Sequence, residues 1–242
     1  MDDEPFYIGY LPKAPPTLTR FTQKTVAGFA AGALLVGAAF AFALPYFGQG
    51  SFDFGQHRDF KGRLRCDAAP RLAGAEADYL LVGYGKNRVA PEICGAADGS
   101  DVVLRGTLIE RDGRRLIEVN SLAQTQGAIA PAPAPIPLGR FTLTGEIVDS
   151  KCYFGVMNPA EGRAHRACAV LCLRGGVPAV FVARDRSGAT LQLIVTGPEG
   201  TAINESLLRW VAEPVEATGE VVRQGKWLVF RIDPASLRYA GS

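Results

Sequence analysis

The chain has 242 residues, with 26 basic and 24 acidic side chains and a net charge of +2. This length supports one or two domains with hydrophobic cores. No basic block stands out, so the charge pattern argues against nucleic acid as a partner. The 28 glycines and 16 prolines gather between apolar runs, which is typical of a β-rich, loop-rich protein.

An uncharged segment near the N-terminus predicts a membrane anchor. No charged residue occurs from Thr25 to Phe52, and residues 25–47 exceed the roughly 20 apolar residues that a bilayer-spanning helix needs. A cleaved signal peptide is the alternative, because Ala41-Phe42-Ala43 has the small-x-small form of a cleavage site. A buried helix of a soluble protein is a further alternative. We expect the anchor, since both the apolar run and the segment before it are long for a signal peptide.

The segment before the span is expected to be an irregular cytoplasmic tail, residues 1–24. Pro12, Pro15 and Pro16 rule out a continuous helix there. Its aromatic stretch, residues 6–11, is interpreted either as lying on the membrane surface or as docking to a partner.

Small residues within the span predict contact with other membrane helices. Gly28 and Gly32 form a G-x-x-x-G pattern, which lets helices approach closely in lipid. Membrane lipid and other membrane-protein subunits are therefore the expected partners.

The location of the rest of the chain is inferred from its cysteines. Basic residues flank the span on both sides, so the positive-inside rule does not decide the orientation. All five cysteines follow the span, as an oxidising compartment would permit. We expect a single-pass protein of the bacterial inner membrane, with a cytoplasmic N-terminus and periplasmic domains.

The remainder predicts a mainly β protein with two tandem domains. A linker, residues 48–58, precedes a first domain at 59–125. A Pro/Ala-rich linker at 126–138 leads to a second domain at 139–242, which contains a short helix at 205–211. The strand candidates are 60–64, 79–82, 102–109 and 115–119 in the first domain, and 141–148, 179–183, 190–195, 215–222 and 227–232 in the second.

The two domains share a pattern of glycines inside strands. Gly106 and Gly219 each lie in a long strand followed by a strand with a basic start, and Gly62 parallels Gly145 in the opening strands. A central glycine permits the sharp bend of a small barrel. Five short strands with an inserted helix resemble the membrane-anchored periplasmic OB-fold proteins, and the resemblance implies two tandem OB-like barrels. A generic β-sandwich is the alternative.

One protein of that kind is the haem chaperone of cytochrome c maturation. The chain lacks the H-x-x-x-Y motif of that chaperone, because His165 is followed four residues later by Ala169. The haem ligand is therefore not carried over.

Two cysteines of the first domain are disulfide candidates. Cys66 follows its first strand and Cys94 lies after its second. In an oxidising compartment they are expected to pair, with a stabilisation of about 3–4 kcal/mol.

The other three cysteines, Cys152, Cys168 and Cys172, lie with His165 in one stretch of the second domain. A helix predicted at 164–174 would end at Gly175-Gly176 and place His165, Cys168 and Cys172 on one face.

Three interpretations of this cluster stay open. In the first, Cys152 forms a disulfide with Cys168 or Cys172 and the remaining thiol is buried. In the second, the three thiolates and the His165 imidazole hold zinc or copper, with Met157 as a nearby thioether. In the third, two of the thiols are redox-active. The odd number of thiols and the expected oxidising compartment favour the disulfide slightly.

No hydrolase, zinc-protease or phosphate-loop motif is present, so no catalytic residue is predicted. We expect an accessory subunit that binds or stabilises a membrane complex, such as one of an electron-transfer chain. The alternative is a metal or haem chaperone that uses the Cys/His cluster. Binding of an oligosaccharide by an OB-like domain is a third class.

Overall fold

The computed structural model describes residues 13–43, 50–67, 69–127, 130–185 and 187–241. The chain divides into two compact units, residues 1–47 and 48–242. The aromatic stretch at 6–11 lies outside the described residues, so neither interpretation of it is tested.

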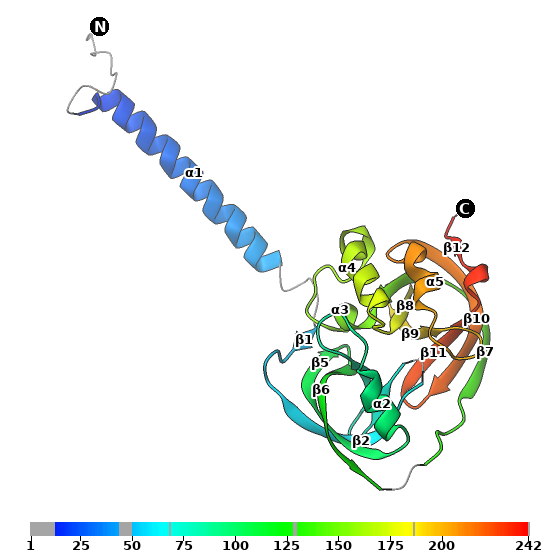
Figure 1. Cartoon of the computed structure of the whole chain (residues 1–242). Helices are drawn as coiled ribbons and strands as arrows, with labels where there is room; N and C mark the ends of the chain where they lie inside the picture. The colour runs from blue at the N-terminus through cyan, green and yellow to red at the C-terminus, as the bar shows by residue number, and fades with distance from the viewer. Residues whose placement is uncertain (1–12, 44–49, 68, 128–129, 186, 242) are drawn as a thin grey trace. The chain divides into compact units, whose positions relative to one another are not determined.

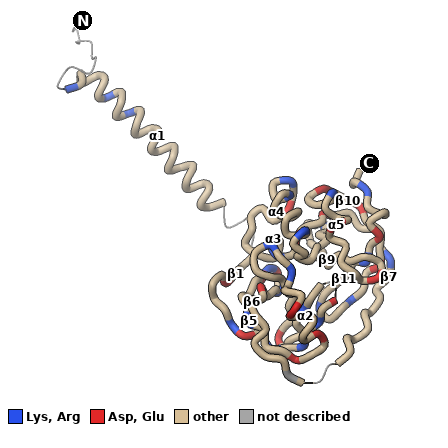
Figure 2. The backbone as a smooth tube through the Cα atoms, in the orientation of Figure 1, with Lys and Arg blue, Asp and Glu red and all other residues tan. Residues whose placement is uncertain are grey.

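The first unit contains one apolar helix, α1 (Pro16–Ala43). Among the described residues it is the one helix long and apolar enough to cross a membrane, with a mean hydropathy of 2.1 and no buried residue. Its basic residues, Arg20 and Lys24, lie toward its N-terminal end (Figure 2). The helix begins within the segment where an irregular tail was expected. Pro16 is the last of the three prolines, and a proline is tolerated at the first helical position because no N–H is needed there.

The second unit is mainly β and contains two closed five-stranded barrels (Figure 1). The strands of the first barrel are β2 (Arg58–Arg65), β3 (Arg71–Ala73), β4 (Asp78–Val82), β5 (Asp101–Arg111) and β6 (Arg114–Gln126). A short strand, β1 (Ser51–Phe52), pairs with β5, and α2 (Pro91–Ala97) connects β4 to β5.

The second barrel repeats this arrangement. Its strands are β7 (Ile136–Asp149), β8 (Ala179–Arg184), β9 (Thr190–Thr196), β10 (Pro214–Gln224) and β11 (Trp227–Ile232). The other elements are α3 (Ser150–Phe154) and α4 (Gly162–Arg174) between β7 and β8, α5 (Asn204–Leu207) and the 3-10 turn Leu208–Trp210 between β9 and β10, and the 3-10 turn Pro234–Ser236 and β12 (Arg238–Tyr239) after β11. All the expected strands are present, whereas β1, β3, α2, α3 and β12 were not expected from the sequence.

Both barrels close with the same strand pairing. In each, the first strand pairs with the second and the fourth, the second with the third, and the fifth with the third and the fourth. The third and fifth strands are parallel, and the other pairs are antiparallel. The repeat inferred from the sequence is therefore present in the fold.

Four strand glycines occupy equivalent places in the two barrels. A Cβ atom at each would lie 2.3–2.6 Å from a carbonyl oxygen of the paired strand; they are Gly62, Gly106, Gly145 and Gly219. Adjacent strands approach too closely there for any side chain, which explains the repeated glycines.

Replacement of Gly219 by alanine should lower the free energy of unfolding by about 1–3 kcal/mol, because the added methyl group is forced against the Arg231 carbonyl. The measurement is denaturant unfolding of the full chain in detergent, followed by tryptophan fluorescence. Gly95→Ala is the matched control, since Gly95 lies in α2 with nothing within 4 Å of its missing Cβ. This control should raise stability by about 0.5–1 kcal/mol. Equal effects of the two substitutions would contradict the close-approach argument.

Three hydrophobic clusters hold the second unit together. One fills the first barrel, with Tyr79 and Leu81 among its members. A second fills the other barrel and includes Phe181. The third combines residues of both barrels, with Leu80 and Val182 among them. Because successive residues of a strand point to opposite faces, β4 and β8 bury one face in their own barrel and the other against the neighbouring barrel.

The expected disulfide between Cys66 and Cys94 is present, with a Cα–Cα distance of 5.6 Å. It ties the end of the first-barrel strand β2 to α2. Since 28 residues separate the two cysteines, the double variant Cys66→Ala/Cys94→Ala should lose about 3–4 kcal/mol of unfolding free energy. Denaturant unfolding measures the loss, and wild-type protein unfolded with a reductant should lose the same amount. A loss below about 1 kcal/mol would show that the crosslink contributes little to this fold.

Candidate metal centre

The connection between β7 and β8 carries the candidate site. Asp149 ends β7 and caps α3, where its Oδ1 accepts a hydrogen bond of 2.8 Å from the Cys152 backbone N–H. The helix α4 begins two residues before the expected start and ends at the expected glycine pair. Gly176 has a φ of +85°, a conformation that favours glycine and stops the helix.

Three thiols meet where α3 and α4 pack together. The Sγ atom of Cys152 lies 3.8 Å from that of Cys168 and 4.0 Å from that of Cys172. The three sulfur atoms all lie within 4.8 Å of one another. All five cysteines belong to the described part of the chain, and these three are free thiols. The expected disulfide between Cys152 and Cys168 or Cys172 is therefore not formed in this structure.

The spacing of the sulfur atoms fits coordination of one metal ion. With metal–sulfur bonds of about 2.3 Å, two thiolates stand about 3.8 Å apart at the tetrahedral angle and about 4.0 Å apart at the trigonal angle. The two Sγ–Sγ distances in the structure, 3.8 and 4.0 Å, agree with these values. Cys152 thus lies from each of the other two thiols at a separation that two thiolates on one metal ion would have.

The predicted fourth ligand, His165, belongs to a second group. Two groups of possible ligands share Cys152. One group consists of the three cysteines, and the other consists of Asp149, Cys152 and His165. His165 is 3% exposed, and its Nε2 lies 3.0 Å from Asp149 Oδ2. The histidine therefore contacts the carboxylate that caps α3, while Cys168 and Cys172 face Cys152.

A lysine from the first barrel completes the surroundings of the thiols. The Nζ atom of Lys86 lies 2.7 Å from Cys168 Sγ and 3.9 Å from Cys172 Sγ. The hydrogen bond to Cys168 raises the pKa of the Lys86 ammonium group. A cation at this place offsets part of the negative charge that metal-binding thiolates bring into the site.

The hydrogen bond between Cys152 and Cys172 shifts the pKa values of these two thiols in opposite directions. It raises the pKa of Cys152 and lowers the pKa of Cys172, because a protonated Cys152 donates to a Cys172 thiolate. Burial raises the pKa of Cys152 further. Cys172 is thus the first of this pair to become the thiolate that a metal ion needs.

A second lysine fixes the segment that carries Lys86. Lys151 Nζ donates hydrogen bonds of 2.8 Å to the Gly83 carbonyl and 2.6 Å to the Gly85 carbonyl. It also forms a buried ion pair with Glu118 on β6. These contacts join α3 of the second barrel to the loop after β4 of the first barrel, and so position Lys86 beside the thiols.

A pocket of about 310 Å³ opens beside the cysteines and is called here the thiol pocket. Cys152 and Cys172 line it, as does Met157, which was named from the sequence as an additional thioether. The other residues of the wall are Phe52, Phe54, Tyr84, Gly85, Lys86, Glu118, Lys151, Gly155 and Val156. A soft thioether therefore lies in the same pocket as the soft thiols.

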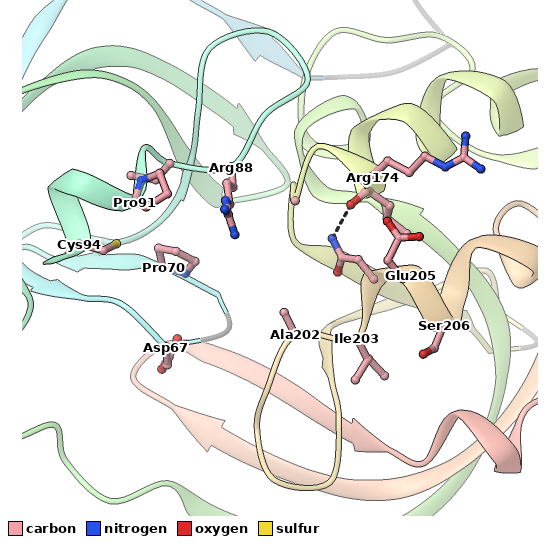
Figure 3. Close-up of a pocket in the computed structure, with 14 residues that line it drawn as sticks. Asp67, Pro70, Arg88, Pro91, Cys94, Arg174, Ala202, Ile203, Glu205 and Ser206 are labelled. Atoms are coloured by element: carbon pink, nitrogen blue, oxygen red, sulfur yellow. Dashed lines mark hydrogen bonds between the residues drawn. The ribbon is translucent and has the colours of Figure 1, made fainter.

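A larger hollow, of about 560 Å³, lies elsewhere between the barrels (Figure 3). Arg88 and Pro91 of the first barrel stand on one side of it, and Ile203 and Glu205 of the second barrel on the other. The cysteine in its wall is Cys94, which is held in the disulfide. The free thiols thus make the smaller pocket the candidate site.

The sequence identified the cysteines and His165 but not their partners. Lys86 contacts Cys168 across 82 residues of chain, and Lys151 contacts Glu118 across 33. Contacts between domains leave no local spacing pattern. Only Asp149 carried a usable signal, because an aspartate directly before a short helix is a typical N-cap.

The chain matches no protein-family model, no curated protein and no solved structure.

Proposed function

We propose that the protein is a membrane-anchored metal-binding protein whose ligands are Cys152, Cys168 and Cys172. The observation that carries this proposal is the separation of the sulfur atoms, 3.8 and 4.0 Å, which is the spacing of thiolates around one ion. The alternative function inferred from the sequence, a metal chaperone, thereby becomes the leading one.

The preferred ion is Cu(I). Structural zinc sites almost always have four ligands in a tetrahedron, whereas three thiolates stand together here. The fourth candidate, His165, is hydrogen-bonded to Asp149, and Cys152 is the one cysteine in its group. Soft sulfur donors select Cu(I), and Met157 in the same pocket adds a thioether. Zinc remains the competitor that the experiment must include.

The barrels support an OB-like assignment, which is also part of the proposal. Each has five strands and a helix between its third and fourth strands, namely α2 in the first barrel and α5 in the second. OB-folds bind ligands with the loops that join strands one to two and four to five. The cysteines lie on α3 and α4, which form the first of these connections in the second barrel.

The proposed location is the bacterial inner membrane, with a cytoplasmic N-terminus and periplasmic barrels. The disulfide Cys66–Cys94 supports an oxidising compartment. Three thiols in mutual contact would themselves be oxidised there unless an ion occupied them. A bound metal therefore reconciles the disulfide of the first barrel with the free thiols of the second.

Metal analysis combined with thiol counting on the full chain tests the proposal. The protein is purified in detergent without oxygen, loaded with Cu(I) or Zn(II), and titrated with a competing Cu(I) chelator. We expect one Cu(I) per chain, displacement of zinc by Cu(I), and three thiols that react with an alkylating reagent only after the metal is removed. No metal and a single reactive thiol would instead support a second disulfide and end the metal proposal.

An accessory role in a membrane complex is the second candidate. The missing side chains of Gly28 and Gly32 have nothing within 4 Å, so this face of α1 is open to a neighbouring helix. Extraction in a mild detergent tests it: a stable assembly larger than the monomer is expected, and Gly28→Leu/Gly32→Leu should dissociate it. A protein that is monomeric in every detergent would exclude this role.

A further inference from the structure

Four exposed apolar side chains surround the opening of the thiol pocket. Phe54 is 71% exposed, Tyr84 68%, Val156 60% and Met157 41%, and all four line the pocket. They come from both barrels: Tyr84 follows β4, and Val156 and Met157 follow α3. We call these four residues the apolar rim. Apolar groups gathered at one opening mark a surface that is covered by something other than water.

The rim lies beside the point where the chain joins the barrels. The missing side chain of Gly50 would lie 2.0 Å from the carbonyl oxygen of Gly155, so residue 50 packs directly on the end of α3. Val156 follows Gly155 at once. The first described residue of the barrel unit therefore contacts the segment that carries half of the rim.

The length of chain between the two units limits how far this point lies from a membrane. α1 ends at Ala43, and the seven residues from there to Gly50 span at most about 25 Å. The chain that follows α1 therefore enters the barrel unit at Gly50, beside the end of α3 and the rim.

We propose that the apolar rim rests on the lipid surface of the membrane in which α1 is anchored. Phe54 and Val156 would insert their apolar groups at the boundary of the acyl chains, and Tyr84 would lie at the headgroup level, where tyrosine is enriched. The opening of the thiol pocket then faces the bilayer, so its ligand is exchanged at the membrane surface. This inference rests on the proposed anchoring by α1 and not on the identity of the metal.

Quenching by brominated lipids tests the contact in the full chain. The variants Phe54→Trp and Tyr84→Trp are reconstituted separately into vesicles of phosphatidylcholine with or without bromine on the acyl chains. In each, the added tryptophan should lose about half or more of its emission in the brominated vesicles. The native Trp210 and Trp227 are 6% and 2% exposed and supply the same background in every sample.

Ile136→Trp is the matched control, because Ile136 is 56% exposed at the start of β7 and does not line the pocket. Its emission should not respond to bromine. If the tryptophans at 54 and 84 respond no more than the control, the rim does not touch lipid and the proposal is wrong. A blue-shifted but unquenched emission at both positions would assign the rim to a protein partner or a second copy, which also overturns it. Failure of the full chain to float with the vesicles would remove the anchor on which the inference rests.

Discussion

Replacement of Cys172 by serine should abolish retention of Cu(I) by the full chain. Structural zinc sites in small peptides bind with about 10–16 kcal/mol over four ligands, so one ligand contributes about 3–4 kcal/mol, or roughly 10²–10³-fold in affinity. The loss is expected to be large here because three thiolates must share the whole coordination. Competition against a chelator measures the change, and the copper content after gel filtration should fall from one ion per chain to near zero.

The variant Ser150→Ala is the matched control for Cys172→Ser. Ser150 is fully buried in α3, two residues before Cys152, and its hydroxyl has no hydrogen-bond partner. Ser150→Ala removes a polar atom from the same helix without touching a ligand, so copper binding should stay unchanged. Cys168→Ser should weaken binding as Cys172→Ser does. Retention of copper within tenfold by both cysteine variants would show that the ligands lie elsewhere.

The barrels were predictable because their signals are local. Gly106 and Gly219 mark strands that approach a neighbour too closely for a side chain, and this requirement is visible as a repeated glycine. The uninterrupted apolar run Tyr79 to Val82 was also visible as a strand, but the reason why both of its faces are apolar was not. Its two faces belong to different hydrophobic clusters, and only the packing of the second barrel explains why both are apolar.

The shorter elements escaped prediction for a related reason. The three residues of β3 and the seven of α2 are too few to show a period of their own. The two residues of β1 pair with β5 within the segment that was predicted to be a linker. Such elements are defined by the neighbours they pair with, which the sequence does not display.

The candidate site was half predictable. Helical spacing predicted that His165, Cys168 and Cys172 share one face of α4, and in the structure Cys168 and Cys172 meet Cys152 there. Whether the thiols form a disulfide or remain free depends on separations that helix packing sets. Lys86 was invisible, because it reaches the thiols from the other barrel.

Replacement of Lys151 by methionine should cost about 3–5 kcal/mol of unfolding free energy. The Lys151 and Glu118 side chains are 10% and 8% exposed, so the substitution leaves a carboxylate buried without its partner. It also removes the hydrogen bonds to the carbonyls of Gly83 and Gly85. Since a buried acceptor without a donor costs about 1–3 kcal/mol, the buried Gly83 carbonyl adds to the loss. Denaturant unfolding of the metal-free full chain measures it.

A double variant separates the ion pair from the packing of the two barrels. Lys151→Met/Glu118→Leu removes both charges together, and it should recover most of the stability that Lys151→Met loses, because a buried pair replaced by apolar residues is often neutral. The exposed pair Arg105–Asp59, with both side chains 51% exposed, gives the comparison. Asp59→Asn should change stability by about 0–1 kcal/mol. If Lys151→Met costs no more than Asp59→Asn, the Lys151–Glu118 ion pair does not hold the barrels together. The apolar contacts between the barrels must then fix the position of Lys86 beside the thiols.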